Sequence, residues 1–328
     1  IPIFIGNMFQ QLYSMADTVI VGKFVGTKAL AAVGSVGTIM FLILGFLQGL
    51  TAGFSVLTAQ RFGAGDMDGM RKTVGTAAVL SLGITVVMTA GSMLTMKPLL
   101  VFMHTPDDIF QDAYAYIMII CAGIAATVLY NLLSGILRAL GDSKTPFLFL
   151  AISVVLNIFL DAFCILVLKW GCAGAAIATI TSQAVSGILC LLFILHRLDF
   201  LCLKKENRHL RFAPIKELLS MGLPMGLQFS ITAIGSMVMQ SANNGLGSVC
   251  VSGFTAGMRI KQFTMCPFDA IGTAASVFCS QNYGAAKPDR IRKGLWQSML
   301  VAVVYGIVAG LIMIFAGRTL SMIFVGKE

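Results

Sequence analysis

Long apolar stretches alternate with short polar connections along the whole chain of 328 residues. A helix rises 1.5 Å per residue, so a block of about 20 apolar residues can cross roughly 30 Å of hydrocarbon. The blocks lack the in-and-out alternation of membrane β-barrel strands. The pattern predicts nine transmembrane helices, over residues 1–22, 29–58, 73–100, 112–138, 146–168, 173–195, 215–242, 249–281 and 294–317.

The composition is that of an integral membrane protein. Hydrophobic residues make up 57% of the chain and charged residues 11%, whereas soluble domains carry about 25% charge. The eight cysteines contain no C-x-x-C pair, so they predict neither a zinc site nor a disulfide framework. We expect no metal and no organic cofactor. The net charge of +9 does not require a nucleic-acid partner, because the basic residues lie mostly in a few connections.

Lysine and arginine are concentrated in every second connection. One set of connections holds 15 of these residues and the other set holds six. The positive-inside rule therefore predicts that the first set is cytoplasmic. On this assignment the chain is a multi-pass protein of the cell membrane, with a cytoplasmic N-terminus and a cytoplasmic linker at 198–214. The basic run 204–209 in this linker can also contact anionic lipid headgroups.

The chain contains an internal repeat at an offset of 221 residues. Residues 60–72 align with residues 281–293 and share Gln, an aromatic residue, Gly, Ala, Asp, Arg and Lys. Six predicted spans separate the copies, so both have the same orientation, as in a parallel repeat. We predict an N-terminal six-helix lobe at 1–197, the linker at 198–214, and a partial C-terminal lobe with three of six helices at 215–328. The three remaining helices are expected beyond residue 328.

Two carboxylates interrupt the apolar spans of the first lobe. Asp161 follows Asn157 by four residues, so the two side chains share a helix face. A carboxylate at mid-membrane depth costs about 2.5 to 3.5 kcal/mol, which indicates a proton or ion site, with an interhelical hydrogen bond as the alternative. Asp17 either belongs to the same site or lies at the outer interface near Lys23. Thr179 is expected to share the cavity of Asp161, or else to join two helices by a hydrogen bond.

Other polar positions in the spans are candidates for a central substrate cleft. The polar residues of the first span recur at helical spacing, and a polar stripe on an apolar span faces protein or water. A similar stripe follows the seventh span, and charged residues lie in the eighth, where the arginine can instead reach the interface. Aromatic faces attract cations, with Tyr130, Phe159 and Phe229 as candidates. The cleft candidates are Asn7, Gln10, Ser14, Tyr130, Gln228, Gln240, Arg259, Lys261 and Asp269.

Several motifs of other function classes are absent from the sequence. It has no G-x-x-x-x-G-K-[ST] loop, so it does not predict transport driven by ATP. The three histidines all fall in predicted connections, and no catalytic constellation accompanies them. The sequence therefore does not predict an enzyme.

Five segments together carry a family resemblance. They are residues 2–22 ending in Ala-Asp-Thr-Val-Ile-Val-Gly, residues 137–146 with Arg-Ala-Leu-Gly-Asp-Ser-Lys-Thr-Pro, the pair Asn157 and Asp161, residues 174–179, and Gln-Asn-Tyr-Gly-Ala at 281–285. With these segments the chain resembles the multidrug and toxic compound extrusion (MATE) family over its whole length. The resemblance implies a twelve-helix secondary transporter with two six-helix lobes around a central cleft. It implies export of organic cations or amphipathic drugs in exchange for protons or sodium ions.

The resemblance also assigns residues. Asp17, Asn157, Asp161 and Thr179 match the cation-binding cluster in the first lobe of the family's DinF-like branch. The second-lobe carboxylates of the NorM-like branch have no counterpart in the seventh span, where Gln228 and Gln240 are uncharged. We therefore expect coupling to reside mainly in the first lobe, with H⁺ or Na⁺ as the coupling ion. The transporter is expected to act as a monomer on a small cationic or amphipathic substrate.

Two other functions remain open from the sequence. A lipid-linked oligosaccharide flippase of similar two-lobe architecture would need cationic cleft residues for a pyrophosphate, and Arg259 with Lys261 could serve. A polytopic membrane enzyme, such as a lipid-modifying transferase, is a more remote alternative, because no metal-binding or nucleophilic cluster lies in the connections.

Overall fold

The computed structural model describes residues 2–103, 105–198, 201, 212–244 and 248–324. In these ranges the chain forms helices joined by short turns, without any β-strand, which confirms the predicted all-helical membrane fold. The elements are α1 (Pro2–Ile20), η1 (Val21–Val25), α2 (Thr27–Gly63), α3 (Met67–Phe102), α4 (Asp107–Ala122), α5 (Ile124–Ala139), α6 (Lys144–Ala162), η2 (Phe163–Val167), α7 (Gly171–Arg197), α8 (Phe212–Asn244), α9 (Ser248–Gly284) and α10 (Pro288–Phe324).

These elements fall on the nine predicted spans in order. The first span corresponds to α1 with η1, the fourth to α4 with α5, and the fifth to α6 with η2. Within the described residues, six helices are long and apolar enough to cross a membrane, or seven if α4 and α5 are one bent span. The remaining two elements on predicted spans, α1 and α9, are not among these helices.

The fourth predicted span is not one continuous helix, contrary to the prediction. It bends by 45° between α4 and α5, at Gly123. A Cβ atom at this position would overlap the side chain of Ile180 on α7, so the glycine lets the neighbouring helix approach closely. The hydrophobic pattern of residues 112–138 continues across the bend and therefore carries no sign of it.

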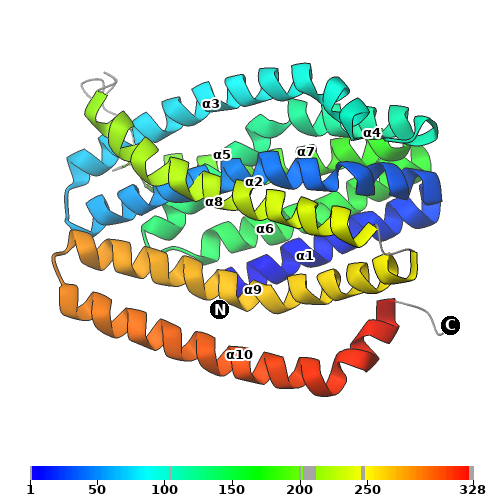
Figure 1. The fold of residues 1–328 in the computed structure, drawn as a ribbon. Helices are drawn as coiled ribbons and strands as arrows, with labels where there is room; N and C mark the ends of the chain where they lie inside the picture. Colours follow the sequence, from blue (N-terminus) through cyan, green and yellow to red (C-terminus); the bar gives the residue numbers. More distant parts are fainter. Residues whose placement is uncertain (1, 104, 199–200, 202–211, 245–247, 325–328) are drawn as a thin grey trace.

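The long helix α2 is the centre of the molecule (Figure 1). It packs against α4, α5, α8 and α9. One apolar core, with Ile117 and Ile124, lies between α2, α4 and α7, and a second, with Phe54 and Leu137, lies further along α2 against α5 and α8. The helix α10 lies at the edge of the molecule against α9 (Figure 1).

The repeat found in the sequence folds into the same turn twice. After α2, the N–H groups of residues 64, 65 and 66 donate to the carbonyls of residues 60, 62 and 61. After α9, residues 285, 286 and 287 donate in the same way to residues 281, 283 and 282, all at 3.0 Å. The left-handed position is Gly65 (φ 70°) in the first copy and Ala286 (φ 54°) in the second. The two copies thus end their long helices with one shared backbone geometry.

Glycines bring the backbones of α2 and α8 into direct contact. A Cβ atom at Gly53 would overlap the Cα of Gly222, and one at Gly49 would overlap the carbonyl oxygen of Met225. Small residues allow such close approach between membrane helices. The first helix after the predicted linker is therefore packed tightly on the central helix of the predicted first lobe. The predicted lobe boundaries themselves stay a prediction.

Candidate functional site

The helix α6 presents Asn157 and Asp161 to α7, as their spacing predicts. Both side chains are buried, with exposed fractions of 1% and 0%. The side-chain amide of Asn157 can be oriented so that both of its polar atoms are hydrogen-bonded. In this orientation the amide nitrogen donates to Oδ2 of Asp161 at 2.8 Å, and the amide oxygen accepts from the backbone N–H of Thr179 at 3.3 Å. Three of the predicted site residues therefore form one hydrogen-bonded group across two helices.

Asp17 joins this group from α1. Its side chain is buried, with an exposed fraction of 8%, so it is not at a solvated interface. It lies close enough to Asp161 for the two carboxylates to interact electrostatically. Neither carboxylate takes part in any of the four ion pairs found in the described part of the chain. Two buried acids thus lie together without a basic partner among the described residues.

Two tyrosines belong to the site and are missing from the sequence-based assignment. The Tyr13 side chain on α1 faces Thr179 and lies in electrostatic range of Asp17 and Asp161. Tyr116 on α4 is 3% exposed and lies in range of the same acids. Tyr13 is four residues before Asp17, so helical spacing could have revealed it. No comparable pattern marks Tyr116 in the sequence.

Four buried oxygen atoms in this cluster lack a hydrogen-bond partner. They are the hydroxyl of Tyr13, Oδ1 of Asp17, Oδ1 of Asp161 and Oγ1 of Thr179. Buried polar groups are normally satisfied, so a concentration of free oxygens requires an explanation. A proton bound to a carboxylate, or a hard cation such as Na⁺ among the oxygens, would satisfy them. The described residues contain no group of three or more His, Cys, Asp or Glu side chains that could hold a metal ion.

Each acid-bearing helix widens into a π-helical turn shortly after its acid. Asp17 precedes η1, which closes with a bond from Gly26 N to Val21 O at 3.2 Å. Asp161 precedes η2, which closes with a bond from Leu168 N to Phe163 O at 3.1 Å. The two wide turns contact each other. Such turns inside helices occur frequently at functional sites.

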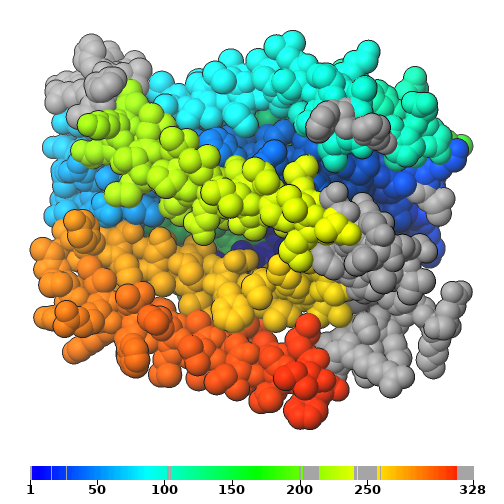
Figure 2. Space-filling view, viewed as in Figure 1, coloured from blue at the N-terminus to red at the C-terminus, as the bar shows by residue number. Residues whose placement is uncertain are grey.

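A cleft lies between α8 and α9, and the dark blue surface of α1 forms part of its floor (Figure 2). The polar stripe of α1 is accessible, with Gln10 and Ser14 exposed and Asn7 half-buried. Gln228 on α8 and Lys261 with Asp269 on α9 are exposed as well. The side chains of Gln240 and Arg259 lie outside the described residues.

The aromatic candidates are not gathered in this cleft. Tyr130 packs in the second apolar core, with its hydroxyl 3.5 Å from the carbonyl oxygen of Pro146 at the start of α6. Phe229 packs on Gly45 and Gly49 in the contact between α8 and α2. Phe159 is 71% exposed on α6. Burial of apolar ring surface, rather than attraction to a cation, accounts for the positions of Tyr130 and Phe229.

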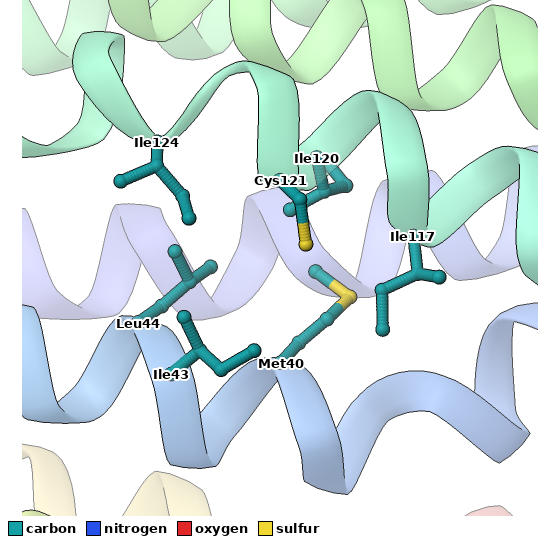
Figure 3. Close-up of a pocket in the computed structure, with 7 residues that line it drawn as sticks. All are labelled: Met40, Ile43, Leu44, Ile117, Ile120, Cys121 and Ile124. Carbon is teal, nitrogen blue, oxygen red and sulfur yellow. The ribbon is translucent and has the colours of Figure 1, made fainter. Parts of the chain in front are cut away.

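A small cavity lies elsewhere, beside the bend between α4 and α5 (Figure 3). Its lining is apolar except for one thiol, and comprises Met40, Ile43, Leu44, Ile117, Ile120, Cys121 and Ile124. It offers no charged or oxygen-bearing side chain to orient a polar ligand. The polar cluster on α1, α6 and α7 is therefore the candidate site.

Comparison with known proteins gives consistent matches over most of the chain. A family model described as MatE matches residues 2–163 and 224–328. The probable multidrug resistance protein YpnP of Bacillus subtilis is 34% identical over 291 residues, which cover 88% of this chain and 65% of that protein. YoeA, another probable multidrug resistance protein of the same organism, is 28% identical over 340 residues, covering 100% of this chain and 73% of that protein.

A solved structure matches as well. It is described as the outward-facing conformation of a multidrug resistance MATE family transporter, with a TM-score of 0.91 and 27% identity. The match covers 99% of this chain and 72% of that one. The chain thus spans about two thirds of the length of the relatives it matches.

Proposed function

This chain belongs to the MatE family, and we propose that it forms part of a secondary transporter that exports cationic or amphipathic small molecules in exchange for protons or sodium ions. The observation that carries the proposal is the pair of buried acids, Asp17 and Asp161, which share a site with unsatisfied oxygens and no basic partner in the described part of the chain. The matched solved structure is described as a transporter and the matched relatives as probable multidrug resistance proteins, so we infer that the chain is not an enzyme.

The site favours a bound positive charge because its own charges are negative. Ionised carboxylates in a low-dielectric interior are costly unless a counter-charge accompanies them. A proton or sodium ion supplies that charge. Asn157 holds one oxygen of Asp161 in place and leaves the other free to receive the ion. Binding and release therefore change the charge of a site to which α1, α6 and α7 all contribute.

Exchange requires the ion and the substrate to prefer different states of the transporter. A ligand that binds two states equally shifts neither population. Because the acids lie on helices that end in adjoining π-helical turns, occupancy of the site can alter how α1 packs on α6. The polar stripe of α1 includes Asp17 and the exposed Gln10 and Ser14, and α1 forms part of the floor of the cleft (Figure 2). An organic cation in the cleft would be attracted by the same carboxylates.

The flippase alternative rests on basic cleft residues. Lys261 is exposed on α9, but Asp269 is exposed on the same helix, so the described side chains of α9 do not form a purely cationic surface for a pyrophosphate. The two acids on α1 and α6 disfavour an anionic ligand further. The family match and the charge of the site together favour efflux.

We further propose that the basic connections, including the turns at 63–66 and 284–287, face the cytoplasm. The charge difference between the two sets of connections supports this orientation. We also propose the monomer as the functional unit.

The test uses the full-length protein in cells loaded with a fluorescent lipophilic cation. Efflux by wild type is compared with Asp161→Asn while the proton and sodium gradients are collapsed separately. We expect efflux to stop in the variant and, in wild type, to follow one of the two gradients. Asp107→Asn, which removes an exposed acid at the start of α4, is the matched control and should retain efflux. Efflux by Asp161→Asn at the wild-type rate would exclude this site from the mechanism.

A further inference from the structure

The two copies of the internal repeat meet each other at one end of the molecule. The last turn of α2 and the last turn of α9 lie side by side (Figure 1). A Cβ atom at Gly63 would overlap the carbonyl oxygen of Gln281, and one at Gly284 would overlap the carbonyl oxygen of Gln60. Gln60 and Gln281 are equivalent in the repeat, as are Gly63 and Gly284. The contact is therefore reciprocal, as across a local twofold axis.

Two polar contacts flank this crossing. The side-chain amide of Gln281 donates to the carbonyl oxygen of Ala139, at the end of α5, at 2.8 Å. Arg61 on α2 donates to Glu217, near the start of α8, at 3.0 Å. Both contacts join a helix that precedes the predicted linker to one that follows it. This end of the cleft between α8 and α9 is thus held together by contacts between the two parts of the chain.

The crossing has the chemistry of a contact that can be broken and remade. At each glycine the nearest neighbour is a main-chain carbonyl, so no interlocking apolar side chain has to be pulled apart. Water can replace the ion pair from Arg61, whose side chain is 38% exposed and whose partner Glu217 is 47% exposed, and Gln281 itself is half-buried. By contrast, the neighbouring contact of α8 with α2 is lined with buried Leu50 and Phe54.

We propose that residues 60–63 and 281–284 form the gate that closes one end of the cleft, and that this gate opens when the two parts of the transporter rock apart. The proposal rests on the transport function proposed above and adds the residues that close the pathway. Alternating access in repeat-built transporters is largely a rigid-body movement of one part against the other. A glycine crossing on the local axis provides a close seal that separates without rearrangement of bulky side chains.

The gate is tested by measuring a distance rather than a transport rate. Spin labels are placed at Met67→Cys and Asp289→Cys, two exposed positions just beyond the crossing, in a cysteine-free version of the full-length protein. Double electron–electron resonance then gives the distribution of label-to-label distances. We expect wild type to populate a short, closed distance. Gly63→Ala and Gly284→Ala should each lose that population, because a methyl group prevents the approach from either side.

Matched controls separate the gate from a general effect of alanine in these helices. Gly34 on α2 and Gly272 on α9 have no atom within 4 Å of an added Cβ, so Gly34→Ala and Gly272→Ala should keep the wild-type distribution. Gln281→Ala is a milder variant that removes only the bond to Ala139 and should reduce the closed population. An unchanged distribution in Gly63→Ala, Gly284→Ala and Gln281→Ala would overturn the proposal.

The result does not depend on the coupling site. If Asp161→Asn retains efflux while Gly63→Ala loses the closed distance, the cation site is excluded and the gate stands. If Asp161→Asn abolishes efflux while Gly63→Ala leaves the distance unchanged, the gate is excluded and the coupling site stands.

Discussion

Asn157 holds one carboxylate oxygen of Asp161 and leaves the other oxygen without a partner. The two residues are one turn apart on α6, and the amide is itself held by the backbone of α7. This arrangement orients an acid without neutralising it. A group that only joined helices would instead use all of its hydrogen-bonding capacity.

Asn157→Ala should alter cation binding and keep the fold. The variant removes a hydrogen bond that both orients Asp161 and stabilises its ionised form, and a bond to a charged group contributes about 1.5 to 3 kcal/mol, so the affinity for the ion should change at least about tenfold. The measurement is ion-dependent efflux by the full-length protein at graded sodium concentration or pH. Unaltered ion dependence would mean that the amide does not serve the site.

The coupling ion should stabilise the protein against heating. A ligand that binds only the folded state at 100 times its dissociation constant adds about 2.7 kcal/mol of stability. We expect the melting temperature of wild type in detergent to rise either on addition of sodium or on acidification. Asp161→Asn should lose this response, since it removes the charge that the ion neutralises. A response of equal size in the variant would contradict the assignment.

Tyr13→Phe should lower the affinity for the coupling ion without lowering the stability of the protein. The hydroxyl of Tyr13 is buried without a hydrogen bond, so its removal should leave stability unchanged or raise it by up to about 1 kcal/mol. Affinity for the coupling ion should nevertheless fall if the hydroxyl is one of its ligands. The thermal shift produced by the ion reports both effects in one experiment. Loss of stability without loss of affinity would show a purely structural role.

The repeated turn predicts opposite effects at two equivalent positions. Ala286 adopts the left-handed conformation at φ 54°, which costs a residue with a side chain about 1 to 2 kcal/mol. Ala286→Gly should therefore stabilise the protein by roughly 0.5 to 1 kcal/mol, part of the gain being lost to the greater freedom of glycine in the unfolded chain. Gly65→Ala should destabilise it by a similar amount. Thermal unfolding of the two variants against wild type measures both changes.

The proposed orientation can be tested by labelling in intact cells. Asp107→Cys lies at the exposed start of α4, and Lys293→Cys lies on the exposed first turns of α10. A membrane-impermeant thiol reagent should label the first variant in intact cells and the second only after permeabilisation. Buried native cysteines such as Cys172 and Cys190 should give little background. The reverse pattern would invert the assigned topology.

Hydropathy located the helices because burial in lipid imposes a strong and continuous pattern. It could not place the bend at Gly123, since the side chains on both sides of the bend are equally apolar. The repeat was visible at residues 60–72 because a turn constrains residue types. The contact between the two copies could not be predicted in the same way, since the repeat pattern does not say which helices cross.

The part of the candidate site that the sequence predicts is the part in which spacing along one helix brings side chains together. Asn157 and Asp161 are four residues apart, and the structure brings both to Thr179. Tyr116 comes from a separate helix with no polar stripe, so only the packing of α4 on α7 reveals it. Phe229 was expected in a cleft but fills the space over two glycines of α2, a role that depends on the partner helix rather than on its own.

The crossing of Gln60–Gly63 with Gln281–Gly284 has the form of an isologous interface, in which position i meets j and j meets i. Two separate half-length chains could make this contact with each other through identical surfaces. In the single chain the two sides are encoded separately, so a substitution at Gly63 alters one side of the contact and leaves the Gly284 side unchanged.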